Sequence, residues 1–157
     1  MMQMNPVRSI SIDDWCALAA EGSAPPVTIP LEGSSMMPLI RRNVDPVTVV
    51  PLQRRLKKGD VVLFTPGAGC YVVHRVWKLR EHQVQTLGDN CWNPDPWLPC
   101  EAVLGQAVTF TRNGRRHRLD TCGARLWGRF WMGLFPVRKC WRRLRSTAGR
   151  LFRAYFK

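Results

Sequence analysis

Three residue types that together can break a peptide bond occur in order along this sequence. Ser35 lies in the run Ser-Met-Met-Pro, and His74 follows 39 residues later in the run Tyr-Val-Val-His-Arg-Val. Asp89, within Gly-Asp-Asn, and Asp95 come next. A serine hydroxyl becomes a useful nucleophile when a base takes its proton, and the base needs a further group to orient it. The sequence therefore offers the nucleophile, base and acid of an acyl-transfer site.

His74 lies in an apolar run of β-branched residues that is typical of a strand. The alternation of a strand places His74 on the same face as Val72 and Val76, and Val73 and Arg75 on the opposite face. A histidine on an apolar face is ordinarily a core residue, and a serine before a proline is ordinarily a turn residue. Their occurrence in one ordered set favours catalysis, because the pKa of imidazole suits proton transfer near neutral pH.

Two aspartates could orient the histidine, and the residues alone leave the choice open. Asp89 and Asp95 both follow a predicted strand, Gln83–Leu87, and either carboxylate could reach an imidazole. Asp89 also has a structural alternative, because Asp and Asn side chains in a Gly-Asp-Asn turn can cap nearby backbone amides. Both residues therefore enter the predicted site.

Four segments carry a resemblance to a known family. They are GSSMMP at 33–38, GDVVLF at 59–64, YVVHRV at 71–76 and GDN at 88–90. In this order they resemble the signature blocks of the type I signal peptidase superfamily, which also includes the self-cleaving SOS-type repressors. The resemblance extends from about Val27 to Asp120. Many members have a lysine base where this chain has His74, so the chain is similar to the subgroup that uses histidine.

The resemblance implies a serine endopeptidase with Ser35 as the nucleophile and His74 as the general base. In the histidine subgroup the orienting acid follows the aspartate of Gly-Asp-Asn by about six residues, which favours Asp95 over Asp89. The implied substrate is a peptide or protein that adds an extended segment to a sheet edge, with small residues before the cleaved bond.

The oxyanion hole of such a site needs donors aimed at the charge that develops on the substrate. The backbone amide of Ser35 is the expected first donor. Signal peptidases commonly place a serine two residues before the nucleophile, but that position is Gly33 in this chain. We therefore expect the hydroxyl of Ser34 to supply the second donor and Met36 to pack beside the nucleophile.

Length and cysteine spacing limit the other function classes. A chain of 157 residues fits one domain with appendages and is long enough to bury a core. Its six cysteines show no C-x-x-C spacing, and its three histidines do not pair with them at zinc-site intervals. We therefore expect no metal, no cofactor and reduced cysteines.

The chain is predicted to have three parts, of which residues 1–24 are a helical lead. Ser11 is the expected cap of a short helix, Ile12–Ala20. Asp13 and Asp14 interrupt any apolar stretch, so we expect no signal peptide. Residues 25–120 are the expected catalytic domain, which is mainly β and, as the resemblance implies, folded as a coiled signal-peptidase-like sheet. Its predicted strands are Val27–Leu31, Val47–Leu52, Asp60–Phe64, Tyr71–Leu79, Gln83–Leu87, Leu104–Arg112 and, after an Asn113-Gly114 hairpin turn, Arg115–Leu119.

Residues 121–157 form the third part, a basic and aromatic-rich tail. It holds ten of the Lys and Arg residues and no Asp or Glu. After Pro136 the apolar residues recur at helical spacing with cations between them, which predicts a basic amphipathic helix. Such a helix can lie on an anionic membrane surface or pack on the β domain. The sequence contains no recognisable nucleic-acid-binding motif, so nucleic acid is the disfavoured partner. The expected membrane contacts are Trp141, Arg142, Arg143, Leu144 and Phe152.

These features predict a serine endopeptidase for a dedicated peptide or protein substrate, such as a leader peptide. No stretch of 18 apolar residues is present, so we expect a cytoplasmic protein that is peripheral on the inner membrane face. The alternative from another class is a catalytically idle relative that acts as a membrane or nucleic-acid adaptor through its basic helix. Self-cleavage between domain and tail, near Cys122–Ala124, is a third possibility.

Overall fold

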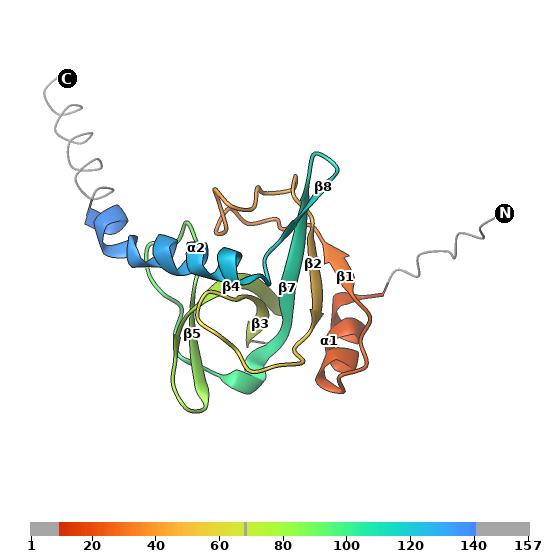
Figure 1. Ribbon diagram of the computed structural model, residues 1–157. Helices are drawn as coiled ribbons and strands as arrows, with labels where there is room; N and C mark the ends of the chain where they lie inside the picture. The colour runs from red at the N-terminus through yellow and green to blue at the C-terminus, as the bar shows by residue number, and fades with distance from the viewer. Residues whose placement is uncertain (1–9, 68, 141–157) are drawn as a thin grey trace, which may run out of the picture.

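The computed structural model describes residues 10–67 and 69–140 (Figure 1). They form an antiparallel sheet in the strand order β1-β2-β7-β3-β4-β5-β6, with β8 paired to β7. The predicted mainly β class is confirmed. The elements are α1 (Ile12–Ala20), β1 (Val27–Ile29), β2 (Val47–Pro51), β3 (Val61–Gly67), β4 (Cys70–Leu79), β5 (Gln83–Leu87), β6 (Leu98–Pro99), the 3-10 helix η1 (Cys100–Ala102), β7 (Val103–Arg112), β8 (Arg115–Arg118) and α2 (Cys122–Gly133).

Helix α1 has the predicted bounds and the predicted cap. The hydroxyl of Ser11 accepts a hydrogen bond from the amide of Asp14 (3.0 Å), which satisfies one of the free donors of the first turn. Trp15 is fully buried against β7, and its indole N–H donates to the carbonyl of Pro25 (2.7 Å). Gly105 of β7 makes this packing possible, because a Cβ there would lie 2.8 Å from the Trp15 ring.

The strands follow the alternation that their sequences predict. Val73 of β4 packs with Leu63 in the core cluster that α1 covers. Val72 and Val76 pack instead with a second cluster around Phe64, on the opposite face of the strand. The predicted hairpin is also present, because Asn113 (φ 50°) and Gly114 (φ 73°) have the left-handed conformations that a type I′ turn requires.

Strand β4 has two neighbours for only part of its length. It pairs with β3 through Phe64↔Val72 and Val61↔Arg75, whereas its pairing with β5 begins at Arg75↔Leu87. Among the described residues, no strand pairs with residues 71–74 of β4 on the side away from β3. Residues 71–74 therefore form an open sheet edge that ends at His74.

Helix α2 was not predicted as a separate element. Thr121 caps it, with its hydroxyl accepting from the amide of Ala124 (3.2 Å). Its first turn includes the segment considered for self-cleavage, which is thus helical rather than the extended chain that a protease binds. Gly128 of α2 lies directly on Arg75 of β4 and leaves no room for a Cβ.

A further helical run, residues 135–140, begins close to Pro136 as predicted. The rest of the predicted basic helix, including Trp141, Arg142, Arg143, Leu144 and Phe152, lies outside the described residues. Among the described helices, none is long and apolar enough to cross a membrane.

Candidate active site

Ser35 lies on the long connection between β1 and β2. The next residue, Met36, is buried in the main core cluster together with Ile40. The amide of Ile40 donates to the carbonyl of Met36 (3.0 Å), so the chain turns tightly after Ser35. Met36 therefore anchors the segment beside Ser35, where the sequence analysis placed it. Ser35 itself remains half-buried.

A buried carboxylate, Asp45, fixes the far end of this connection. It accepts hydrogen bonds from the side chains of Arg41 and Arg112, and Arg112 also donates to the carbonyl of Leu39 (2.8 Å). Burial favours the neutral acid, but the two arginines outweigh it and hold the pKa of Asp45 well below its usual range. The connection that carries Ser35 is thus tied to β7 as well as to the core.

The Gly-Asp-Asn turn holds the backbone of the predicted nucleophile. The amide of Asn90 donates to the carbonyl of Ser35 (2.6 Å), and the side-chain amide of Asn90 donates to the carbonyl of Ser34 (3.3 Å). These contacts of Asn90 with the backbone of Ser34 and Ser35 differ from the prediction, in which the Asp and Asn side chains cap backbone amides near the turn. Two loops that are far apart in sequence are therefore joined at Ser35.

Asp95 is the acid that contacts the predicted base. Its carboxylate lies 2.7 Å from His74 Nδ1 and accepts a second hydrogen bond from the hydroxyl of Thr86 (2.5 Å). Its backbone is held on both sides, because the Asp95 amide donates to Thr86 O (2.9 Å) and Gln85 Nε2 donates to Asp95 O (2.9 Å). With Nδ1 facing Asp95, Nε2 is the ring nitrogen left for a substrate or nucleophile.

Asp89 has a different partner. Its two carboxylate oxygens accept from Nε (2.9 Å) and Nη2 (2.8 Å) of Arg75, and both side chains are buried. Arg75 Nη1 also donates to the carbonyl of Gly59 (2.9 Å). The structure brings Asp95, and not Asp89, to His74, so the alternative in which Asp89 orients the base is set aside.

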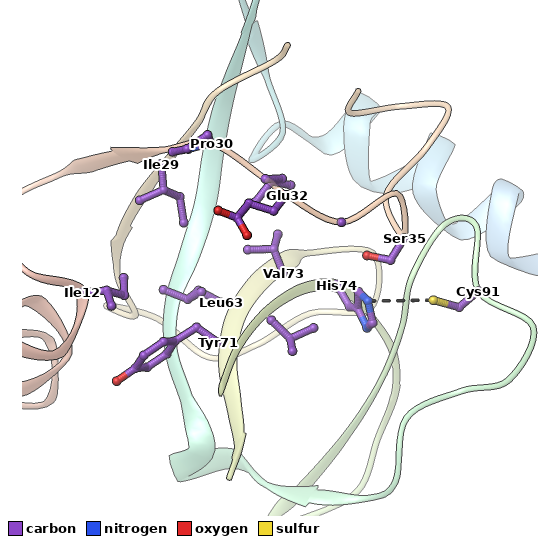
Figure 2. A pocket seen from close by; sticks show the side chains of 13 residues that line it. Ile12, Ile29, Pro30, Glu32, Ser35, Leu63, Tyr71, Val73, His74 and Cys91 are labelled. Carbon is purple, nitrogen blue, oxygen red and sulfur yellow. Dashed lines mark hydrogen bonds between the residues drawn. The ribbon is translucent and has the colours of Figure 1, made fainter. Parts of the chain in front are cut away.

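Ser35 and His74 line one cavity of about 780 Å³, shown in Figure 2. Its walls come from the end of β1 and the chain after it, from β3 and β4, from the loop after β5 and from α1, and they are mostly apolar. Glu32 is the only acidic side chain among its described lining residues. The lining residues are Ile12, Ile29, Pro30, Leu31, Glu32, Gly33, Ser35, Leu63, Tyr71, Val72, Val73, His74 and Cys91.

The predicted second oxyanion donor does not reach this cavity. Ser34 is exposed and does not line it, although Gly33 and Ser35 do. The carbonyl of Ser34 accepts hydrogen bonds from Met37 N (3.2 Å) and Asn90 Nδ2 (3.3 Å), so its backbone is already engaged. The assignment of Ser34 to the oxyanion hole is therefore not supported, and the backbone amide of Ser35 remains the expected donor.

Cys91 is a site residue that the sequence analysis missed. Its sulfur lies 3.9 Å from His74 Nε2, and Figure 2 shows the thiol directed at the imidazole ring. Among the described contacts, no hydrogen bond joins the Ser35 hydroxyl to His74, although both line the cavity. In the sequence, Cys91 is marked only by its position directly after Gly-Asp-Asn. That spacing does not by itself indicate a contact with His74.

Gly88 is required by close packing at the centre of the site. A Cβ at this position would lie 2.5 Å from Cys91 Sγ, 2.9 Å from His74 Nε2 and 2.9 Å from Ser35 O. Because each of these atoms would have to move, we expect Gly88→Ala to lower kcat/KM of any acyl-transfer reaction that uses Ser35 and His74 by about 10- to 100-fold.

Gly67→Ala is the matched control for this change, because an added Cβ there meets nothing within 4 Å. Thermal unfolding of both variants separates misplacement of the site from loss of the fold. A folded Gly88→Ala protein with the wild-type rate would show that hydrolysis does not depend on this packing.

The protonation of His74 gives the site an expected pH dependence. Burial lowers the pKa of His74, but the hydrogen bond and charge of Asp95, assisted by Cys91, outweigh it and raise the pKa from 6.5 to about 9. A general base must be neutral, so kcat/KM should increase with pH up to about 9. Asp95→Asn should move this rise to lower pH while it slows the reaction.

The same shift predicts a contribution of His74 to stability. Because the folded pKa lies above the unfolded value, protonated His74 stabilises the fold below pH 6.5, and this contribution is lost as the pH rises to about 9. Urea unfolding of the wild-type chain and of His74→Gln across this range measures this contribution to the free energy of unfolding.

The pH dependence of the rate has its own contradicting result. A pH-rate profile that is flat between pH 6 and 9 would contradict the assignment of His74 as the base.

The site thus combines an imidazole oriented by a carboxylate with two nucleophilic side chains, Ser35 and Cys91, around one cavity. A scan against protein-family models found no family that matches this chain, and a search of the curated proteins also found no match. The arrangement of His74, Asp95, Ser35 and Cys91 suits nucleophilic acyl transfer, in which a base oriented by an acid activates a hydroxyl or a thiol.

Proposed function

We propose that this chain is a serine endopeptidase similar to the histidine-base signal peptidases. The observation that carries the proposal is the 2.7 Å contact between Asp95 and His74 Nδ1, which leaves Nε2 clear of the carboxylate, beside a cavity that His74 and Ser35 both line. An imidazole held in this way can accept a proton at Nε2 while the carboxylate stabilises the resulting charge. The site requires neither a metal nor an organic cofactor for this step.

In the proposed mechanism Ser35 Oγ attacks the carbonyl carbon of the substrate and its proton passes to His74 Nε2. The backbone amide of Ser35 donates to the developing oxyanion. His74 then gives the proton to the leaving amine as the C–N bond breaks, and water hydrolyses the acyl-enzyme by the same steps in reverse. Bound substrate would replace the contact between Nε2 and Cys91, since catalytic hydrogen bonds often form only in the complex.

The proposed fold is that of the signal peptidase superfamily. The segments that carry the resemblance are structurally connected, which supports this proposal. GDVVLF supplies β3 and YVVHRV supplies β4, and the two strands pair with Val62 opposite His74. The GDN turn contacts the backbone of Ser35 in the GSSMMP segment through Asn90.

The proposed substrate is an extended segment of a peptide or protein. The open edge at residues 71–74 offers backbone hydrogen bonds to such a segment, and the chain at 30–33 forms the opposite wall. The apolar walls suit small or aliphatic side chains before the cleaved bond. We propose that the substrate is a dedicated one, such as a leader peptide, met in the cytoplasm or at the inner membrane face.

The test compares protein N-termini by mass spectrometry in host cells that carry the wild-type chain or Ser35→Ala. It requires no prior choice of substrate. New N-termini that depend on Ser35, particularly after small residues, would support the protease and identify its targets. If the two profiles match while both proteins are folded and equally abundant and the native substrate is present, the idle adaptor becomes the better description.

A further inference from the structure

The outer face of α2 exposes large apolar side chains. Leu126, Trp127 and Phe130 are 56%, 54% and 58% exposed, and Val137 in the following helical run is 64% exposed. The ring centroids of Trp127 and Phe130 lie 5.7 Å apart, so the two aromatic residues form one patch. A soluble helix ordinarily turns such residues toward a core, and an exposed group of them marks a surface that binds something apolar.

A basic cavity adjoins this patch. It has a volume of about 360 Å³ and is lined by four cations, Lys57, Lys58, Arg125 and Arg129, together with Cys122 and Leu126 of α2. None of its described lining residues is acidic. Arg125 Nη1 donates to the carbonyl of Asp120 (2.8 Å) and lies 3.9 Å from the carboxylate of Asp60.

The other three cations are available to a ligand. Within the described part of the chain, no ion pair joins Lys57, Lys58 or Arg129 to a carboxylate. These charges belong to a chain with a net charge of +13, so the field around the cavity attracts anions. Leu126 belongs both to the cavity wall and to the apolar patch, which makes the two features one continuous surface.

We propose that this surface docks on an anionic phospholipid bilayer. Trp127, Phe130 and Leu126 enter the interfacial layer, and the cations of the cavity bind lipid phosphate groups. Apolar burial and attraction to anionic headgroups then add, as in interfacial helices. A nucleic acid would use the same cations but gives no favourable environment to exposed Leu126, so a bilayer fits the combined surface better. This site is distinct from the predicted contacts at residues 141–157.

Other residues of α2 and of the helical run after it contact the loop that follows β5. Trp131 Nε1 and Arg138 Nη1 both donate to the carbonyl of Asp89, at 3.1 and 2.6 Å. Asp89 belongs to the loop that also carries Cys91 and Asp95. Docking through α2 would therefore hold the candidate active site close to the membrane surface, where a membrane-bound or membrane-inserting substrate is concentrated.

The test measures co-sedimentation of the full chain with large unilamellar vesicles of phosphatidylcholine, with or without phosphatidylglycerol. We expect binding to the mixed vesicles, and a loss of at least about tenfold in Lys58→Gln/Arg129→Gln. Arg115→Gln/Arg116→Gln is the matched control, because it removes the same charge from the exposed hairpin strand β8 and should retain most binding.

The apolar half of the surface has its own pair of variants. Phe130→Ala should lower binding about tenfold or more, whereas Val44→Ala should have little effect although Val44 is 57% exposed. Circular dichroism confirms that each variant is folded. Vesicle binding does not require an active Ser35, so this test and that of the proposed protease succeed or fail separately.

Three results would overturn the proposal. Equal losses in Lys58→Gln/Arg129→Gln and Arg115→Gln/Arg116→Gln would assign binding to net charge or to residues 141–157. Equal binding to vesicles without phosphatidylglycerol would remove the role of the anionic headgroup. If inorganic phosphate or a single-stranded RNA binds and depends on Lys58 and Arg129 while vesicles do not bind, the surface is a site for a free anion or for nucleic acid.

Discussion

Replacing Ser35 with alanine should lower kcat/KM for the proposed peptide substrate by a factor on the order of 10⁴ or more. In the proposed mechanism the change removes the hydroxyl that forms the acyl-enzyme, while the anchors of its loop, Met36 and Asp45, stay in place. Stability should therefore change little. The measurement is hydrolysis of a synthetic peptide whose sequence is taken from the Ser35-dependent cleavage sites, with unfolding curves for both proteins.

Cys91→Ala is the control that tests which side chain is the nucleophile. The thiol of Cys91 lies 3.9 Å from His74 Nε2, so it could in principle be activated by the same base. If Ser35 is the nucleophile, Cys91→Ala should retain hydrolysis within about tenfold of the wild-type rate. Loss of activity in Cys91→Ala, with activity retained in Ser35→Ala, would replace the serine mechanism with a cysteine mechanism on the same His74–Asp95 pair.

The sequence predicted those parts of the fold whose determinants are local. β5 and α1 have their predicted bounds, and the Asn113-Gly114 turn produces the hairpin of β7 and β8. Alternation in a strand and the preference of Asn and Gly for positive φ act over a few neighbouring residues. For the same reason His74 was correctly placed on a strand face.

Contacts between distant segments could not be predicted in this way. Helix α2 was missed because helical spacing was followed only after Pro136, and the position of α2 is set by the packing of Gly128 on Arg75. Arg75 was expected only to lie opposite His74 on its strand, yet it is 1% exposed and paired with Asp89. The contact of Cys91 with His74 likewise depends on the path of the loop after β5, which short sequence patterns do not specify.

The buried pair of Arg75 and Asp89 leads to the largest expected effect on stability. Asp89→Ala leaves the guanidinium of Arg75 buried beneath α2 without its carboxylate, which should lower the free energy of unfolding by about 3–5 kcal/mol. Urea denaturation measures this change. Asp120→Ala is the control, because its partner Arg118 has a side chain that is 67% exposed, and the loss of a surface pair should cost about 1 kcal/mol or less.

Asp95→Asn should give the opposite result, because Asp95 is partly exposed and acts on His74. Asparagine keeps the size of the side chain but cannot stabilise a protonated imidazole, so the rate should fall by about 10²- to 10⁴-fold. Stability should change little above about pH 9, where His74 is neutral and the charge of Asp95 no longer stabilises it. Two aspartates six positions apart in one loop would then have separate functions. If Asp89→Ala instead kept its stability and lost activity, Asp89 would return as a candidate for the orienting acid.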